Sequence, residues 1–147
     1  MGPVVDLNLK GTYLCTRFVI THMKEKGSGR IINISSQGGR SKSELSNLPY
    51  ASAKAGILGF TRQLAQEVGR WGILVNAIAP GIILTEKAIR RWQERSEEER
   101  QKMLEAIPLR RLGNPEEISH VAVFLASDKA TYITGATIDV NGGRFMM

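Results

Sequence analysis

The sequence has very little cysteine and no long apolar run. Its one thiol, Cys15, excludes an internal disulfide bond and favours a reducing compartment, so we expect a cytoplasmic location. The apolar helix face on which Cys15 falls predicts that it belongs to the core. Asp6 and Lys10 interrupt the first apolar stretch, which argues against a signal peptide. The longest apolar runs have the length of a strand, so no membrane-spanning segment is expected.

A glycine-rich phosphate-binding loop is missing as well. Gly38 and Gly39 follow a predicted strand, but no third glycine stands at the required offset and no suitable helix begins there. We therefore reject this pair as a dinucleotide-binding fingerprint. His22 and His120 have no partner at the spacing of metal ligands, so no metal site is predicted.

The net charge of +6 does not identify a partner by itself. Much of it lies in residues 87–111, where glutamates are interleaved with the basic residues. This pattern predicts a solvated helical face, and no stripe of aromatics and arginines accompanies it. Nucleic acid is therefore the less favoured partner, and an anionic substrate or an acidic protein is a simpler use of the charge.

Helices and strands are predicted to alternate along a single domain, residues 1–147. Segments of this kind favour the α/β class with a parallel, doubly wound sheet. The first predicted helix has an apolar face formed by Val5, Leu9, Leu14, Phe18 and Val19. The further elements are a strand over 30–35, a polar loop over 36–48, a helix over 50–70, a strand over 73–79, a capping box opening a helix at 96–99, a helix from Asn114 to about 127 and a strand over 137–140.

Tyr50 and Lys54 stand four residues apart at the start of the second long helix, fourteen positions after Ser36. Residues i and i+4 share a helix face, so the ammonium can lie beside the phenol and favour its ionised form. A serine hydroxyl near them can hold a substrate oxygen. The spacing alone is weak, because Tyr13 has Arg17 at the same offset. The context is stronger, since ligands of parallel sheets bind beyond the carboxyl ends of the strands.

Several ordered motifs together resemble the short-chain dehydrogenase/reductase family over essentially the whole chain. The subgroup that the ending of the sequence resembles most is the β-ketoacyl-acyl-carrier-protein reductases. The segments that carry the resemblance are Asp6 to Gly11, Gly29 to Ser36, Tyr50 to Lys54, Val75 to Gly81 with Thr85, Leu112 to Glu117, Tyr132 to Gly135 and Asn141 to Gly143.

The resemblance implies a set of catalytic roles. Tyr50 would donate a proton to a carbonyl oxygen, and Lys54 would lower the pKa of Tyr50 and bind the ribose of the cofactor. Ser36, rather than Ser35, would orient the carbonyl, although the two serines can also be read as a plain turn at a strand end. Asn8 would hold a water in a proton relay, or it bonds backbone within its helix.

The resemblance also implies a cofactor and partners. The cofactor would be NADP or NAD, with NADP favoured by the subgroup, and Pro80, Gly81, Ile83 and Thr85 would lie against its nicotinamide. The expected reaction interconverts a carbonyl and a secondary alcohol. The substrate would be a small molecule or an acyl thioester, and an acyl carrier protein is a possible partner, which Lys24, Lys26 and Arg30 would meet near the site edge. Sugar and secondary-alcohol dehydrogenases share most of these motifs.

Relatives of this kind begin with a cofactor-binding half that has no counterpart here. The expected fold is therefore a partial Rossmann-like sheet of the last three strands with flanking helices, an incomplete catalytic domain that binds cofactor poorly by itself. The strand over 30–35 should be an edge strand. The helices over 5–23 and 51–70 would associate with a second copy, so a homo-oligomer is expected, and a non-catalytic assembly module is the alternative function. Asn33 and Asn76 are predicted to be structural.

Overall fold

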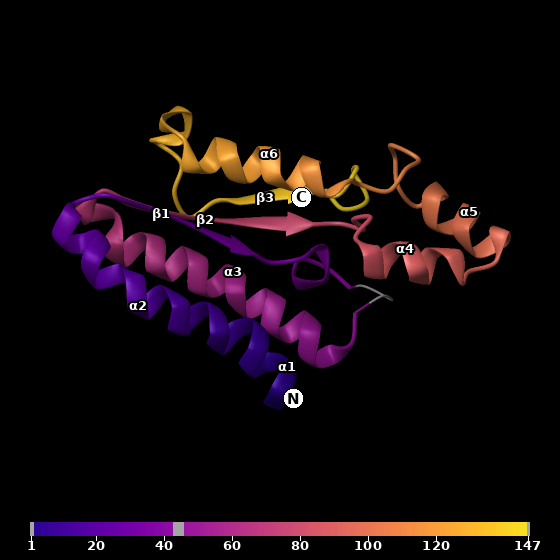
Figure 1. Cartoon of the computed structure of the whole chain (residues 1–147), viewed down its shortest axis with the longest axis horizontal. Helices are drawn as coiled ribbons and strands as arrows, with labels where there is room; N and C mark the ends of the chain where they lie inside the picture. Colours follow the sequence, from indigo (N-terminus) through magenta and orange to yellow (C-terminus); the bar gives the residue numbers. More distant parts are fainter. Residues whose placement is uncertain (1, 43–45, 147) are drawn as a thin grey trace.

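The computed structural model describes residues 2–42 and 46–146. Three parallel strands form one sheet in the order β1 (Gly29–Ile34), β2 (Ile73–Pro80) and β3 (Thr137–Val140). Helices α2 (Gly11–Lys26) and α3 (Leu48–Val68) cover one face, and α6 (Pro115–Ala126) covers the other (Figure 1). The predicted α/β class, the three parallel strands and the covering of both faces are confirmed.

The central strand β2 is the most deeply buried element. Ile73, Val75 and Ile78 expose none of their surface, because β2 has a strand on each side and helices above and below. This explains why its sequence is a continuous apolar run rather than an alternating one. In contrast, β1 pairs only with β2, and the side chain of Ile34 at its end is 45% exposed. Among the described residues β1 is therefore an edge strand, as predicted.

Each face of the sheet has its own core. Ala65 and Val68 of α3 pack with Ile73 and Val75 on one face. On the other face, Leu125 of α6 packs with Ile78.

Helix α3 begins two residues before the predicted start, because the side chain of Asn47 accepts a hydrogen bond from the backbone of Tyr50 and proline lies in the first turn.

The N-terminal helix corrects two expectations. Cys15 is exposed rather than buried, and Phe18 is 85% exposed. The helix consists of α1 (Gly2–Val5), a π-helical stretch (Asp6–Lys10) and α2, which together form one continuous helical segment. Leu14 and Phe18 lie on the opposite side of the helix from the half-buried Leu9 and the buried Thr16, so the apolar residues of this helix do not share one face. The buried residue of α2 is Thr16, and its half-buried Ile20 packs against the core.

Two asparagines tie strands to neighbouring elements, as predicted. The Asn33 amide donates to the Thr61 hydroxyl at 2.9 Å. Asn76, which is 1% exposed, donates to the carbonyl of Ile133 at 2.8 Å and accepts from the amide of Ala136 at 3.0 Å. Asn76 thereby holds the turn that leads into β3.

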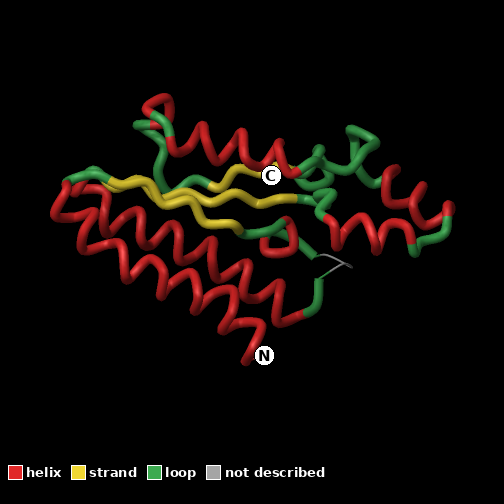
Figure 2. Tube along the Cα trace, in the orientation of Figure 1, coloured by secondary structure: helices red, strands yellow, loops and turns green. Residues whose placement is uncertain are grey.

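Two charged helices lie outside the sheet, beyond the carboxyl end of β2 (Figures 1 and 2). They are α4 (Glu86–Gln93), which is capped by Thr85, and α5 (Glu97–Glu105), which is opened by the predicted capping box of Ser96 and Glu99. The sequence pattern did not predict α4 as a separate helix within the charged segment. None of the helices in residues 2–42 and 46–146 combines the length and the apolar character that crossing a bilayer requires.

Candidate active site

Ser36, one of the predicted site residues, lies just after the end of β1. Residues Ser35 and Ser36 follow β1 directly, and a short 3-10 turn over Gln37–Gly39 comes next. The amide of Ser35 still bonds to the carbonyl of Ile78 at 2.8 Å, so the ladder extends to the first serine. Because β1 and β2 are parallel, this end lies at the same edge of the sheet as Pro80.

The two serines have different environments. Ser35 is 3% exposed and its hydroxyl donates to the carbonyl of Lys54 at 2.8 Å. Ser36 is half-buried, and its hydroxyl accepts a hydrogen bond from the Gly38 amide at 3.1 Å. An accepting hydroxyl still has its own hydrogen to donate. Ser36 is therefore the serine that suits a carbonyl ligand, while Ser35 fastens the strand end to α3.

Lys54 links helix α3 to the end of β1. Its ammonium donates to the carbonyl of Ile34 at 2.9 Å and lies 5.6 Å from the centroid of the Tyr50 ring. Burial lowers the pKa of Lys54 below its ordinary value, because desolvation disfavours the ammonium. An ammonium has three N–H bonds. One of them serves Ile34, so the side chain can still bind hydroxyl groups beside Tyr50.

The glycines after Ser36 serve packing. A Cβ on Gly39 would lie 2.6 Å from the carbonyl carbon of Lys54, and one on Gly38 would strike the hydroxyl of Ser46. Gly39 therefore lets the turn lie directly on α3, and Gly38 lets it lie beside the loop before α3. This agrees with rejecting the pair as a phosphate cradle, since its close neighbours are protein atoms.

Asn8 lies in the π-helical stretch. Its side-chain amide donates to the carbonyl of Val4 at 2.9 Å, and its own carbonyl accepts from the hydroxyl of Thr12 at 2.8 Å. The stretch packs against α3, where Gly56 leaves room for Leu9. The structure thus shows the backbone-bonding alternative for the Asn8 side chain. Its role in a proton relay stays a prediction.

The predicted nicotinamide segment begins at the end of β2. The amide of Gly81 bonds to the carbonyl of Val140, and a Cβ on Gly81 would lie 2.8 Å from Cα of Asn141. Ile83 forms a single bridge with Gly113, and the hydroxyl of Thr85 accepts from the amide of Ala88 to cap α4. These contacts hold the segment against the C-terminal strand, and its contact with a cofactor stays a prediction.

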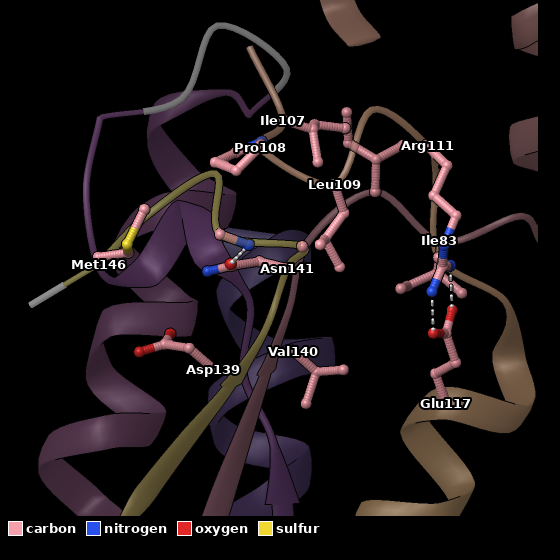
Figure 3. Close-up of a pocket in the computed structure, with 14 residues that line it drawn as sticks. Ile83, Ile107, Pro108, Leu109, Arg111, Glu117, Asp139, Val140, Asn141 and Met146 are labelled. Atoms are coloured by element: carbon pink, nitrogen blue, oxygen red, sulfur yellow. Dashed lines mark hydrogen bonds and ion pairs between the residues drawn. The ribbon is translucent and has the colours of Figure 1, made fainter. Parts of the chain in front are cut away.

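A hollow of about 510 Å³ lies beside this segment. Figure 3 shows Ile107, Pro108 and Leu109 on one side and Asn141 below them, with the ion pair of Arg111 and Glu117 at the edge. The lining is mostly apolar, and Ile83 contributes to it. A local motif could not indicate this hollow, because the segments that form it are far apart in the sequence.

The Arg111–Glu117 pair has the geometry of a bidentate bridge, with N–O distances of 2.8 and 2.7 Å. Glu117 also accepts from the amide of Asn114 at 2.8 Å, which caps α6. These bonds, first the one from Arg111 and then the one from Asn114, lower the pKa of Glu117 from its usual 4.5 to about 2.

We expect this depressed pKa to appear as a pH-dependent stability. A carboxylate whose pKa is lower in the folded state stabilises the fold above its unfolded pKa and loses this effect as the pH falls through the folded value. Urea midpoints of the wild type and of Glu117→Gln should therefore differ by a small, constant amount above about pH 5 and converge between about pH 4.5 and 2. A difference that stayed constant down to pH 2 would contradict the assignment.

The basic residues Lys24, Lys26 and Arg30 lie away from the site. Lys24 and Lys26 are in the last turn of α2, and Arg30 is at the start of β1. Ser36 follows the other end of the same strand. The expectation that they border the site is wrong for this chain, because α2 runs back along the sheet and ends where β1 begins. The ammonium of Lys24 lies 4.3 Å from the ring centroid of Trp71 instead.

An ion pair that the sequence analysis missed joins Arg40 to Asp139. Arg40 donates from Nε and Nη2 to the two carboxylate oxygens at 3.2 and 2.8 Å. No local signal could have revealed it, since the partners are 99 positions apart.

Within the described residues no group of three or more possible ligand side chains could hold a metal ion.

Comparisons with known proteins show which family this chain belongs to. A family model described as Enoyl-(Acyl carrier protein) reductase matches residues 2–144. The 3-oxoacyl-[acyl-carrier-protein] reductase FabG of Pseudomonas aeruginosa is 48% identical over 143 residues, which cover 97% of this chain and 56% of that protein. The acetoacetyl-CoA reductase of Shinella zoogloeoides is 47% identical over 146 residues, covering 99% and 59%.

A solved structure shows the same relation in three dimensions. A 3-oxoacyl-[acyl-carrier protein] reductase from Brucella melitensis with bound NAD matches with a TM-score of 0.85 and 38% identity, covering 97% of this chain and 51% of that one. The fold is a Rossmann-like α/β module with polar side chains at the carboxyl end of β1. The chain belongs to the short-chain dehydrogenase/reductase family, and it resembles the 3-oxoacyl reductases within it. It spans a little over half the length of the curated relatives it matches.

Proposed function

We propose that this chain carries the catalytic site of an NAD(P)-dependent oxidoreductase that interconverts a carbonyl and a secondary alcohol. The observation that carries the proposal is the bond of the Lys54 ammonium to the carbonyl of Ile34, two residues before Ser36, with the same ammonium 5.6 Å from the Tyr50 ring. A phenol, a neighbouring cation and a hydroxyl with a free hydrogen are the groups that protonation of a carbonyl oxygen requires.

Each residue has a distinct task in this proposal. Ser36 donates a hydrogen bond to the carbonyl oxygen and holds it beside Tyr50. Tyr50 gives its proton to the same oxygen as the carbon is reduced, and Lys54 favours the resulting phenolate by its charge. Asn8 would orient a water that returns the proton. In the forward direction one carbonyl, one hydride and one proton give one alcohol.

The residues present fit a nicotinamide dinucleotide at this edge. Lys54 has N–H groups left for ribose hydroxyls, and the Thr85 hydroxyl, which only accepts in its capping bond, can still donate. Pro80, Gly81 and Ile83 belong to the same segment as Thr85, and their backbone would lie against the nicotinamide. The dinucleotide supplies the hydride when bound. We favour NADP over NAD because of the subgroup, and the partial domain would hold only the nicotinamide end.

The substrate we propose is a 3-oxoacyl thioester, with an acyl carrier protein as its possible bearer. The support is the resemblance to relatives named for 3-oxoacyl-[acyl-carrier-protein] and acetoacetyl-CoA reduction. The mostly apolar hollow beside Ile83 is compatible with an acyl substrate. A sugar or another secondary alcohol is the alternative substrate.

A second candidate function is assembly without turnover. Leu7 and Phe18 are 80% and 85% exposed on the N-terminal helix, and Leu14 and Val19 are also exposed there. Apolar side chains in such numbers are typical of a contact surface. A second copy packing its own α2 and α3 on this surface would form a homo-oligomer. Mixing the chain with a full-length relative should then give mixed oligomers even when Tyr50 is replaced by phenylalanine.

The proposed reaction can be tested in two arms. Calorimetric titration of the 147-residue chain with NADPH and NADH measures whether the chain alone binds cofactor. A chimera, in which the chain replaces the matching 143 residues of the Pseudomonas reductase, measures the catalytic half in a complete domain. We expect the chimera to oxidise NADPH with acetoacetyl-CoA. A folded chimera that binds NADPH and reduces neither this thioester nor simple ketones would contradict the proposal.

A further inference from the structure

The turn that carries Ser36 is held from two directions. On one side Gly39 packs directly on the backbone of Lys54 in α3. On the other side Arg40, which directly follows the 3-10 turn, forms the bidentate ion pair with Asp139. The side chains of this pair are only 16% and 22% exposed, less than those of the other ion pairs in the described residues. For comparison, Lys102 and Glu98 on α5 are 71% and 78% exposed.

The pair crosses the carboxyl edge of the sheet. Asp139 lies on β3 beside Ala79 of β2, and β2 separates β3 from β1. Arg40 therefore reaches from the end of β1 over the end of β2. Its guanidinium also lies 5.6 Å from the centroid of the Phe145 ring, so the C-terminal segment folds back over it.

This connection continues to the predicted nicotinamide segment. The Asn141 amide donates to the carbonyl of Phe145 at 3.0 Å, and its oxygen accepts from the amide of Gly143 at 2.9 Å. The backbone of Asn141 lies against Gly81, where there is no room for a Cβ. Arg40 and Asp139 are thus connected to the Pro80–Gly81 turn through Phe145 and Asn141.

We propose that Arg40 and Asp139 are positioning residues that hold the Ser36 hydroxyl at a fixed distance from the Pro80–Gly81 turn. The proposal rests on the proposed function, in which Ser36 holds the carbonyl and the Pro80–Gly81 turn holds the hydride donor. A displacement of about 1 Å between such groups lowers a rate about 100-fold. An exposed ion pair contributes little to stability, whereas this one is mostly desolvated and lies four residues from Ser36.

The first test measures the turn itself and needs no turnover. In the 147-residue chain, the amide of Gly38 donates to Ser36 Oγ and that of Gly39 to the Ser36 carbonyl. We expect Arg40→Met to speed hydrogen exchange of these two amides about tenfold or more, while the β2 amides keep their rates. Arg40→Lys retains the charge without the fork and should give intermediate rates. Lys102→Met is the control and should leave all these rates unchanged.

The second test measures catalysis with NADPH and acetoacetyl-CoA, with the same substitutions placed in the chimera with the Pseudomonas reductase. We expect Arg40→Met to lower kcat about 10- to 100-fold with little change in the KM for NADPH, and Arg40→Lys to recover part of it. Unchanged exchange in Arg40→Met, or faster exchange with unchanged kcat, would overturn the inference. If the wild-type chimera binds NADPH but reduces nothing and the exchange still accelerates, the positioning of the turn is supported and the proposed function alone is contradicted.

Discussion

Replacing Tyr50 by phenylalanine is expected to lower carbonyl reduction about 100- to 10,000-fold, the range that one general acid contributes. The variant keeps the ring that lies 5.6 Å from the Lys54 ammonium and removes only the hydroxyl. Packing should therefore survive, because Tyr50 is half-buried at the start of α3 and its backbone amide, not its hydroxyl, forms the bond to the Asn47 cap. Steady-state NADPH oxidation in the chimera with the Pseudomonas reductase measures the loss.

Tyr13→Phe provides the matched control. Tyr13 has Arg17 at the same offset of four, but it lies on α2, and its ring meets Phe60 edge to face. We expect kcat within about twofold of the wild type for this variant, because substitutions of exposed side chains away from the site have small effects. If Tyr13→Phe and Tyr50→Phe lost activity equally, or if Tyr50→Phe kept it, the assignment of the proton donor would be wrong.

Among the substitutions that we propose, Asn76→Ala is expected to lower the free energy of unfolding the most. The Asn76 side chain is almost fully buried, and it satisfies one acceptor at Ile133 and one donor at Ala136. Alanine leaves both backbone groups without this partner, and each such group costs about 1–3 kcal/mol. We expect about 3 kcal/mol less unfolding free energy and a Tm lower by about 10 °C, measured by urea and thermal unfolding of the 147-residue chain.

The control for this prediction lies in the same connection to β3. Thr131 is exposed and follows the 3-10 turn over Asp128–Ala130. Thr131→Ala should change the unfolding free energy by about 0.5 kcal/mol or less. An Asn76→Ala variant with a loss below about 1 kcal/mol would show that the turn relaxes to satisfy both backbone groups, against our interpretation.

Much of the fold could be predicted because its signals are local. The apolar run of β2, the 3.6-residue period of α3 and the caps at Ser96 and Asn114 each depend on residues within one turn or one strand. The alternation of these elements then favours a parallel sheet, since a helix can return the chain to the same end. The helix predicted over 5–23 is present, but its buried face was not predicted, because the apolar Leu14 and Phe18 lie on the exposed side and the polar Thr16 on the buried side.

The sequence by itself determined where the proposed catalytic groups lie along the chain, since Ser36 follows one strand and Tyr50 and Lys54 open the next helix. Only the tertiary structure decided how those groups are held. The burial of Ser35 on the Lys54 carbonyl leaves Ser36 as the available hydroxyl. The contact of Arg40 with Asp139 depends on β2 lying between β1 and β3. Local propensity acts over a few residues, whereas these contacts form only when segments up to 99 positions apart pack together.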